Sequence, residues 1–207
     1  MPSVNAAMTT LRERKKQRTR MAIAKAAVEL CAARGYETVT MADVAAAADV
    51  GERTAFRYFH DKAELLFAED AAVHEALDDA LAARPPHEPP AVAIREALAS
   101  LASRWQGRHT EGRTRQAIID ATPALKAREG IKHLEYQRTL AAGLCGRGTH
   151  AAPARLLAGV AVACFHEATS RWLVDEDSTR PGLEARIRDT FAELHLLLDL
   201  EAPSDGP

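Results

Sequence analysis

The segment from Thr40 to Lys62 constrains the fold more than any other part of the chain. It reads TMADVAAAADVGERTAFRYFHDK: a short apolar stretch, an Asp-Val-Gly tripeptide, and a second stretch that mixes aromatic with polar side chains. Apolar residues at helical spacing predict two short helices, and Asp and Gly favour tight turns. Thr40, with Asp43 three residues later, is typical of a capped helix start. The sequence therefore predicts a helix-turn-helix.

Composition favours an all-α chain of one or two domains. Alanine, the best helix former, is used heavily, and runs of β-branched residues are absent. A chain of 207 residues, 47% of them hydrophobic, can bury a sizeable core. About nine helices are expected: Leu11–Arg34, a short helix after Thr40, Glu52–Phe59, Asp61–Ala83, Ala91–Gln106, Thr110–Ala121, Pro123–Leu144, Pro153–Val174 and Pro181–Leu200.

Charge divides the chain into a basic head and an acidic body. Residues 1–62 hold 11 Lys and Arg against 7 Asp and Glu, a charge of +4, whereas residues 63–207 carry −6. Six of the ten residues from Leu11 to Arg20 are basic. A basic first domain fits a nucleic-acid partner. We therefore expect a DNA-binding domain over residues 1–62 and a separate helical domain over residues 63–207.

Capping residues, prolines and the spacing of apolar residues predict where helices begin and end and which faces they bury. Thr10 with Glu13 predicts a capping box, and Gly35 a helix stop. The Pro-rich residues 84–90 predict a stiff, extended connector. Phe56 and Phe59, three apart, are expected to anchor the second helix of the motif. An apolar stripe on the last helix comprises Leu183, Ile187, Phe191, Leu194 and Leu198.

The second helix of the motif carries side chains suited to base edges in a major groove. Arg53 and Arg57, four apart, suit guanine, and Thr54 suits a base edge or a thymine methyl. Tyr58 and Lys62 suit phosphate oxygens. A helical hairpin with solvated arginines is the structural alternative. The expected DNA contacts are Thr40, Met41, Glu52, Arg53, Thr54, Phe56, Arg57, Tyr58, Lys62, Arg14 and Lys16.

Residues 18–66 resemble the N-terminal domain of the TetR family of bacterial transcriptional regulators. The resemblance rests on Arg18-Thr19-Arg20, Ala26-Ala27, Gly35-Tyr36, Thr40, Val44-Ala45, Val50, Thr54, the FRYF run at 56–59 and Lys62. Two turn positions depart from the family: Asp49 replaces a usual Gly, and Gly51 a usual Ser. Asp tolerates a left-handed backbone, so the turn is expected to survive. At Gly51 the serine hydroxyl that would cap the second helix or contact a phosphate is missing.

The resemblance implies that residues 63–207 are a ligand-binding and dimerisation domain. It also implies a homodimer formed by the last two helices, a pseudo-palindromic operator and a small-molecule effector that releases DNA. A repressor is expected. An activator or co-regulator of the same fold stays open, because the position of the operator relative to the promoter decides whether binding represses or activates transcription. The effector pocket would draw on Trp105, His133, Tyr136, Phe165, His166 and Trp172, although a lone His is more often a core residue. The basic side of Pro123–Leu144 would meet an anionic ligand such as a coenzyme A ester, or only solvent.

Other classes of function find little support in the sequence. Cys31, Cys145 and Cys164 lie far apart, and no Cys or His pair has zinc spacing, so neither disulfides nor metal are expected. No catalytic motif or cofactor signature appears, which disfavours a small helical enzyme with an incidental hairpin. No signal peptide or apolar stretch of membrane-spanning length appears, so a cytoplasmic protein without membrane contact is expected.

Overall fold

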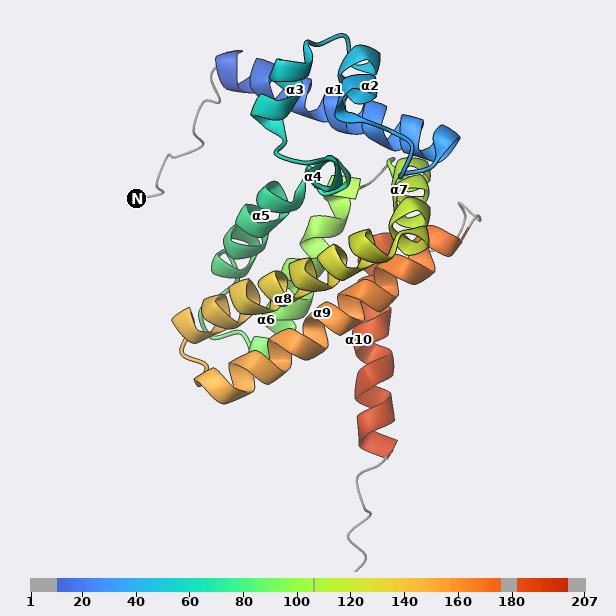
Figure 1. Ribbon diagram of the computed structural model, residues 1–207. Helices are drawn as coiled ribbons and strands as arrows, with labels where there is room; N and C mark the ends of the chain where they lie inside the picture. Colours follow the sequence, from blue (N-terminus) through green and yellow to red (C-terminus); the bar gives the residue numbers. More distant parts are fainter. Residues whose placement is uncertain (1–10, 106, 176–181, 201–207) are drawn as a thin grey trace, which may run out of the picture. The chain divides into compact units, whose positions relative to one another are not determined.

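The computed structural model describes residues 11–105, 107–175 and 182–200, with side chains described to residue 198. These residues form ten α-helices and one short 3-10 helix, which confirms the all-α prediction (Figure 1). The elements in chain order are α1 (Leu11–Arg34), α2 (Met41–Ala47), α3 (Glu52–Tyr58), α4 (Lys62–Leu66), α5 (Asp70–Ala82), α6 (Pro90–Leu101), η1 (Ala102–Trp105), α7 (His109–Ala121), α8 (Pro123–Gly146), α9 (Ala151–Val174) and α10 (Leu183–Leu200).

Two predicted helices are interrupted in the structure. The helix expected over Asp61–Ala83 is two helices, α4 and α5, with the break at residues 67–69. Phe67 and Ala68 are buried at this break, and no Gly or Pro marks it in the sequence. The helix expected over Ala91–Gln106 tightens into a 3-10 turn from Ala102. The predicted capping box at Thr10 and the start at Pro181 lie outside the described residues.

The chain divides into two compact units. One contains Met1–Ala68 and Thr114–Thr122, and the other contains Glu69–Arg113 and Pro123–Pro207. Helix α7 contributes residues to both. The helix-turn-helix predicted from the sequence lies entirely in the first unit.

The first unit is built on α1, which packs against α2 and α4, while α2 packs against α3. Helix α1 ends where Gly35 takes a φ of +83°, a left-handed conformation that glycine adopts without a steric penalty. This is the helix stop that the sequence predicted. The core side chains of this unit include Ile23, Ala27, Cys31, Val39, Val44, Ala45, Ala55, Phe59, Leu65, Leu66 and Phe67.

The second unit encloses a larger helical core. Helix α9 packs against α8 and α10, α6 packs against α5 and α10, and α5 packs against α8. Alanines dominate the buried side of α9, at Ala154, Ala158, Ala161 and Ala168. Small side chains at this spacing let neighbouring helices approach closely, so α9 is central in this unit.

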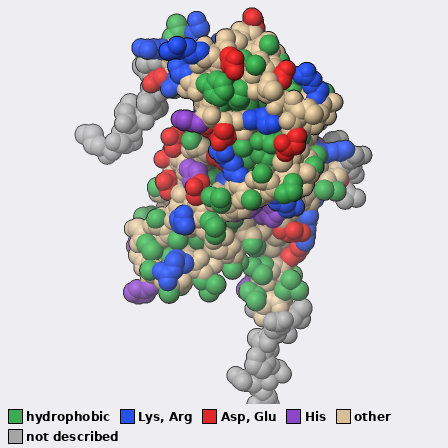
Figure 2. Space-filling model, viewed as in Figure 1, with side chains coloured by type: hydrophobic (Ala, Val, Ile, Leu, Met, Phe, Trp, Pro, Cys, Tyr) green, Lys and Arg blue, Asp and Glu red, His purple; other side chains and the backbone are tan. Residues whose placement is uncertain are grey.

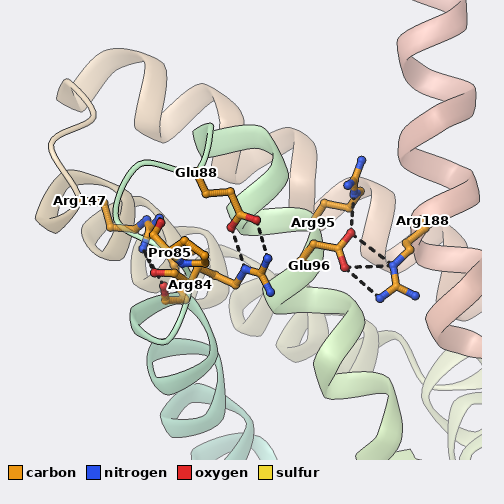
Figure 3. Close-up of polar contacts among 8 residues, drawn as sticks. Arg84, Pro85, Glu88, Arg95, Glu96, Arg147 and Arg188 are labelled. Atoms are coloured by element: carbon orange, nitrogen blue, oxygen red, sulfur yellow. Dashed lines mark hydrogen bonds and ion pairs between the residues drawn. The ribbon is translucent and has the colours of Figure 1, made fainter.

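The Pro-rich residues 84–90 form a compact turn, so the extended connector predicted from the sequence is wrong. The Glu88 amide donates to the Pro85 carbonyl at 3.1 Å. The Arg147 guanidinium donates to the carbonyls of Leu81, Arg84 and Pro85 at 3.2, 2.9 and 2.6 Å (Figure 3). The Leu81 carbonyl lies in the last turn of α5 and the other two follow it, where a helix has no internal donors left. A distant arginine therefore closes the loop.

An ion-pair cluster joins α6 to α10 close to this loop. The Arg188 guanidinium donates to Oε2 of Glu96 at 3.0 and 2.9 Å and to Oε1 at 3.3 Å (Figure 3). Arg95 donates to Oε1 of the same carboxylate at 2.8 Å. These bonds hold the pKa of Glu96 below its usual range. The contact fixes the first half of α10 against the core.

Candidate nucleic-acid interface

The turn between α2 and α3 has the backbone that a helix-turn-helix requires. Asp49 adopts a φ of +53°, the left-handed conformation that the sequence predicted for it. The amide of Val50 donates to the Ala45 carbonyl at 3.0 Å, and the amide of Thr54 donates to Gly51 at 2.8 Å. Gly51 is the N-cap residue of α3 and provides no side-chain hydrogen bond to the helix. The turn thus closes through backbone bonds alone at this position.

Helix α3 presents a mixed polar and aromatic face to solvent. Glu52, Arg53, Phe56 and Arg57 are exposed, whereas Ala55 is fully buried against the rest of the unit. Thr54 and Tyr58 are half-buried at the edges of this face. The Arg57 guanidinium lies 5.5 Å from the centroid of the Tyr58 ring. The predicted base-reading and phosphate-binding side chains of α3 therefore share one helix and lie on or beside one exposed face.

The expectation that Phe56 and Phe59 both anchor α3 is confirmed for Phe59 and wrong for Phe56. Phe59 is 0% exposed, as expected, but Phe56 is 47% exposed. The helix ends at Tyr58, and Phe59 takes an extended backbone with φ −140° and ψ 127°. The helical i, i+3 relation no longer holds across that end, so Phe59 turns inward while Phe56 stays with the exposed face. A contact between Phe56 and DNA stays a prediction.

The start of α2 is occupied by a capping box. The Thr40 hydroxyl accepts from the Asp43 amide at 3.1 Å, and the Thr40 amide donates to the Asp43 carboxylate at 2.9 Å. Hydrogen bonds from Thr40 lower the pKa of Asp43. The capped start is as predicted. Thr40 is exposed, but its hydroxyl and amide already have partners, and the side chain of Met41 is buried.

Lys62 is held by the turn that follows α1. Its ammonium donates to the Tyr36 carbonyl at 2.6 Å and lies 4.1 Å from the centroid of the Tyr36 ring. The predicted phosphate contact must therefore share this ammonium with an internal partner. The sequence feature that indicates this contact is Tyr36 itself, an aromatic residue directly after the glycine that ends α1.

Helix α1 contributes two kinds of basic side chain. Arg14 and Lys16, predicted to bind DNA, are exposed near its start. Arg20 is different: its guanidinium donates to the Tyr58 carbonyl at 2.7 Å and to the Ala68 carbonyl at 3.3 Å, and lies 4.3 Å from the Phe59 ring. Sequence reasoning counted Arg20 among the basic block and missed its role as a clamp on the end of α3.

The residues predicted to line an effector pocket form separate contacts in the second unit. Trp105 and Phe165 have ring centroids 5.9 Å apart, and His133 and His166 lie 4.9 Å apart across α8 and α9. Trp172 contacts His109 edge to face at 4.8 Å, and the His109 ring nitrogen lies 2.8 Å from the Trp172 carbonyl. The structure thus brings four of the six predicted residues together as two pairs.

The polar members of this set are constrained by burial. Burial, with smaller contributions from Lys132 and His166, lowers the pKa of His133 to about 4. The hydroxyl of Tyr136 donates to Asp70 at 3.4 Å, and its ring lies 4.6 Å from that of His74. Tyr136 is only 5% exposed, so it sits between α5 and α8 as a core residue. Its role as an effector contact stays a prediction.

The described part of the chain offers neither a metal cluster nor a membrane-spanning helix. It contains no group of three or more His, Cys, Asp or Glu side chains arranged to hold a metal ion. Within the same ranges, no helix has the length and apolarity that crossing a membrane demands.

Comparisons with known proteins agree with this geometry. The family model for bacterial regulatory proteins of the tetR family matches residues 23–68, and that of the MftR C-terminal domain matches residues 88–196, more than half of the chain. The HTH-type transcriptional regulator TcmR of Streptomyces glaucescens is 33% identical over 143 residues. The match covers 66% of this chain and 63% of TcmR, so it spans less than two thirds of that relative.

Solved structures share the fold at low identity. The regulator FadR of Bacillus subtilis, determined in complex with stearoyl-CoA, aligns with a TM-score of 0.57 at 18% identity and covers 84% of this chain and 96% of its own. The fatty acid degradation regulator FadR of Bacillus halodurans gives 0.57 at 17% identity, with 90% and 96% covered. These likenesses concern the arrangement of helices.

Proposed function

We propose that this chain, which belongs to the TetR family of bacterial regulatory proteins, is a ligand-responsive transcriptional repressor that binds a pseudo-palindromic operator as a homodimer. The observation that carries the proposal is the exposed face of α3, where Glu52, Arg53, Phe56 and Arg57 face solvent directly after a left-handed turn. Exposed arginines on a short helix after such a turn suit the major groove.

Each side chain of this face has a physical role in the proposal. Arg53 and Arg57 are long enough to reach guanine O6 and N7, and Phe56 supplies an apolar ring for a thymine methyl. Glu52 would accept from cytosine N4 or exclude other bases. Tyr58, Lys62, Arg14 and Lys16 would bind phosphates, which set register without reading sequence. At Thr40 and Met41, the backbone amides of the first turn of α2 would do the same, because the Met41 side chain is buried and the Thr40 hydroxyl caps the helix.

The proposed homodimer uses α9 and α10. Leu196, Leu197 and Leu198 are 60–63% exposed near the end of α10, and Val174 at the end of α9 is 79% exposed. Apolar side chains gathered on a helix that its own core leaves uncovered are suited to a second copy of the chain. Two copies would present two α3 helices to half-sites about 34–36 Å apart.

The proposed effector binds in the second unit and acts through differential affinity for the DNA-bound and released states. Its surroundings would include the Trp105–Phe165 and His133–His166 pairs, Tyr136 and Trp172. Because a relative of the same fold was determined with stearoyl-CoA, a long-chain acyl-CoA is the first compound to test. We place the protein in the cytoplasm, where operator and effector meet.

The test is a fluorescence-anisotropy titration against duplexes selected by the protein from a random pool and against the DNA upstream of its own gene. A scrambled duplex serves as the control. Binding that survives about 150 mM salt and exceeds the scrambled control by about a thousandfold is expected. Equal, salt-labile binding to every duplex would contradict the proposal.

An activator of the same fold is the alternative for the sign of regulation. It would bind the same operator, so a promoter-reporter assay with and without the protein separates the two. A small helical enzyme is the remote alternative. It predicts no specific DNA affinity, and the titration above distinguishes it.

A further inference from the structure

The linker between α3 and α4 exposes a histidine that the proposed DNA contacts do not include. Phe59 has an extended backbone, and successive side chains of an extended segment point to opposite sides. Phe59 is 0% exposed, whereas the side chain of the next residue, His60, is 94% exposed. The same backbone geometry that sends Phe59 into the core therefore sends His60 into solvent, directly after the proposed recognition helix.

The His60 ring is nevertheless held in place by the Glu64 carboxylate. The His60 amide donates to Glu64 Oε2 at 2.8 Å, and the ring Nδ1 lies 3.1 Å from the same oxygen. Two contacts to one oxygen fix the ring relative to the backbone. The other ring nitrogen, Nε2, has no hydrogen-bond or ion-pair partner among the described residues.

Glu64 carries a negative charge that is largely shielded from solvent. Burial raises the pKa of Glu64, but hydrogen bonds from His60 and Arg20 outweigh it and bring the pKa below its usual range. The Arg20 guanidinium donates to Glu64 Oε1 at 3.5 Å. Because the Glu64 side chain is 23% exposed against 94% for His60, an approaching anion meets the imidazole before it meets the carboxylate.

The other charged groups near His60 have partners of their own. Asp61 is the N-cap of α4 and accepts from the Glu64 amide at 2.6 Å. Lys62 donates to a backbone carbonyl in the turn after α1, and Arg57 of α3 lies over an aromatic ring. Among the described residues, Glu64 is thus the charged group in direct contact with the His60 ring.

Protonation changes what the exposed nitrogen can do. When Nδ1 donates its proton to Glu64, a neutral imidazole presents a bare lone pair at Nε2, which repels a phosphate oxygen. The imidazolium carries a proton on both nitrogens, so it can donate to Glu64 and to an external anion at once. Histidine is the side chain whose charge ordinarily changes between about pH 5 and pH 8. The pair is therefore suited to bind an anion in mildly acid solution and to release it in alkaline solution.

The surroundings of His60 identify the anion. His60 lies two residues after the last residue of α3, in a unit whose residues 1–62 carry a charge of +4. Figure 2 shows Lys and Arg side chains gathered at the exposed start of α1 in the same unit. A duplex that accepts α3 in its major groove brings backbone phosphates to the ends of that helix. The anion that fits this place is a DNA phosphate.

We propose that His60 is a pH-dependent phosphate contact, which makes operator affinity rise as the solution becomes more acid. This inference rests on the proposed function, because the phosphate belongs to the operator. The complex holds a proton on His60 that the free protein holds less tightly, so affinity increases as pH falls from about 8 to about 6. Solution pH would then regulate DNA binding separately from the effector.

The test is an anisotropy titration of a selected operator at about pH 8 and about pH 6, at constant ionic strength, with variants of the full-length chain. His60→Asn keeps an amide donor for Glu64 but has no group at the position of Nε2. His60→Arg supplies a cation that does not titrate in this range. His87→Asn, at an exposed position in the loop after α5, is the control. Circular dichroism at both pH values checks that every variant is folded.

The wild type and His87→Asn should both bind about three- to tenfold more tightly per protomer at the lower pH, the range expected for one net hydrogen bond. His60→Asn should lose most of that gain. Its penalties for substituted base pairs should match those of the wild type, because a phosphate contact reads no sequence. His60→Arg should bind at the higher pH as tightly as the wild type binds at the lower one.

An equal pH dependence in the wild type and in His60→Asn would overturn the inference and leave specific operator binding in place. A loss confined to particular base pairs would overturn the assignment to phosphate. Failure of the wild type to bind any duplex specifically at either pH is a different result, because it removes the proposed function itself. The two failures are therefore distinguishable in one experiment.

Discussion

The Arg20 guanidinium donates to the carbonyl of Tyr58 at 2.7 Å and so joins the middle of α1 to the last residue of α3. The same guanidinium lies 4.3 Å from the ring of Phe59 and also meets the Ala68 carbonyl. The final carbonyls of a helix lack internal donors, and a cation there also complements the helix dipole. One side chain thus fixes where α3 ends and where Phe59 enters the core.

Arg20→Ala should destabilise the protein by about 1.5–3 kcal/mol, because it removes charge-assisted hydrogen bonds and a cation–π contact. Urea unfolding of the variant and the wild type measures the change in the free energy of unfolding. Arg20→Lys should recover part of the loss, since a lysine ammonium can reach one carbonyl but cannot bridge two.

The matched control for this change is Arg18→Ala, which removes an exposed arginine two residues earlier. Its stability should stay within about 0.5 kcal/mol of the wild type. Equal losses for Arg18→Ala and Arg20→Ala would mean that the measured effect comes from helix charge and that the clamp contributes nothing.

The parts of the fold set by local chemistry were predictable from the sequence. Asp49 in the turn, Thr40 with Asp43 at a helix start and Gly35 at a helix stop each depend on neighbours within a few residues. Arg147 closing the loop after α5 depends on a residue more than sixty positions away, so no local pattern revealed it. The exposure of Phe56 likewise depends on where α3 ends.

The candidate interface divides in the same way. The exposed arginines of α3 followed from helical spacing, whereas the clamp by Arg20 and the partner of Lys62 required the packing of α1 against later helices. In the second unit, the aromatic and histidine residues that the sequence predicted for the pocket do lie on helices. Their pairing across α8 and α9 depends on helix register, which one sequence does not determine.

Arg57→Ala should weaken operator binding by about 1–3 kcal/mol and relax specificity at one base pair, because the proposal assigns this exposed guanidinium to guanine. Titrations against operators with every base at the affected position provide the measurement. A uniform loss with unchanged base preference would instead assign Arg57 to phosphate binding.

Lys62→Gln should have two effects. Stability should fall by about 1–2 kcal/mol, because the Tyr36 carbonyl loses a charged donor. If the remaining donors of the ammonium bind phosphate as proposed, the salt slope should also fall by about one unit per protomer, equally for all sequences. A stability loss with an unchanged salt slope would restrict Lys62 to holding Tyr36.

His133 should make stability depend on pH in mildly acid solution. Its pKa is about 4 in the folded protein, against an ordinary value of 6.5. Between these values the unfolded chain binds a proton that the folded chain does not, so stability falls as pH drops from about 6.5 to 4. Because solvent reaches part of the ring, the expected loss is about 1–2 kcal/mol.

His133→Asn removes this titration. Urea unfolding at pH 7.5 and pH 5 should therefore give a smaller pH difference for this variant than for the wild type. His87→Asn, at an exposed position in the loop after α5, is the control and should leave the pH difference unchanged. Identical pH differences for wild type and His133→Asn would show that other groups govern the acid dependence.

The proposed dimer can be tested at the end of α10. The predicted apolar stripe divides in the structure: Leu183 and Ile187 are buried in their own unit, whereas Leu198 is 60% exposed. Leu197→Asp combined with Leu198→Asp should therefore break the dimer without opening the core, because both side chains are already in solvent within one chain. Light scattering after size-exclusion chromatography should report the mass of one chain.

Leu156→Asp provides a control on α9, since Leu156 is 71% exposed but lies near the opposite end of that helix from Val174. It should leave the dimer intact. A monomer carrying the α10 double change should still bind a single half-site weakly and lose the affinity gained from two linked half-sites. A dimeric mass for the double variant would place the interface elsewhere on the second unit.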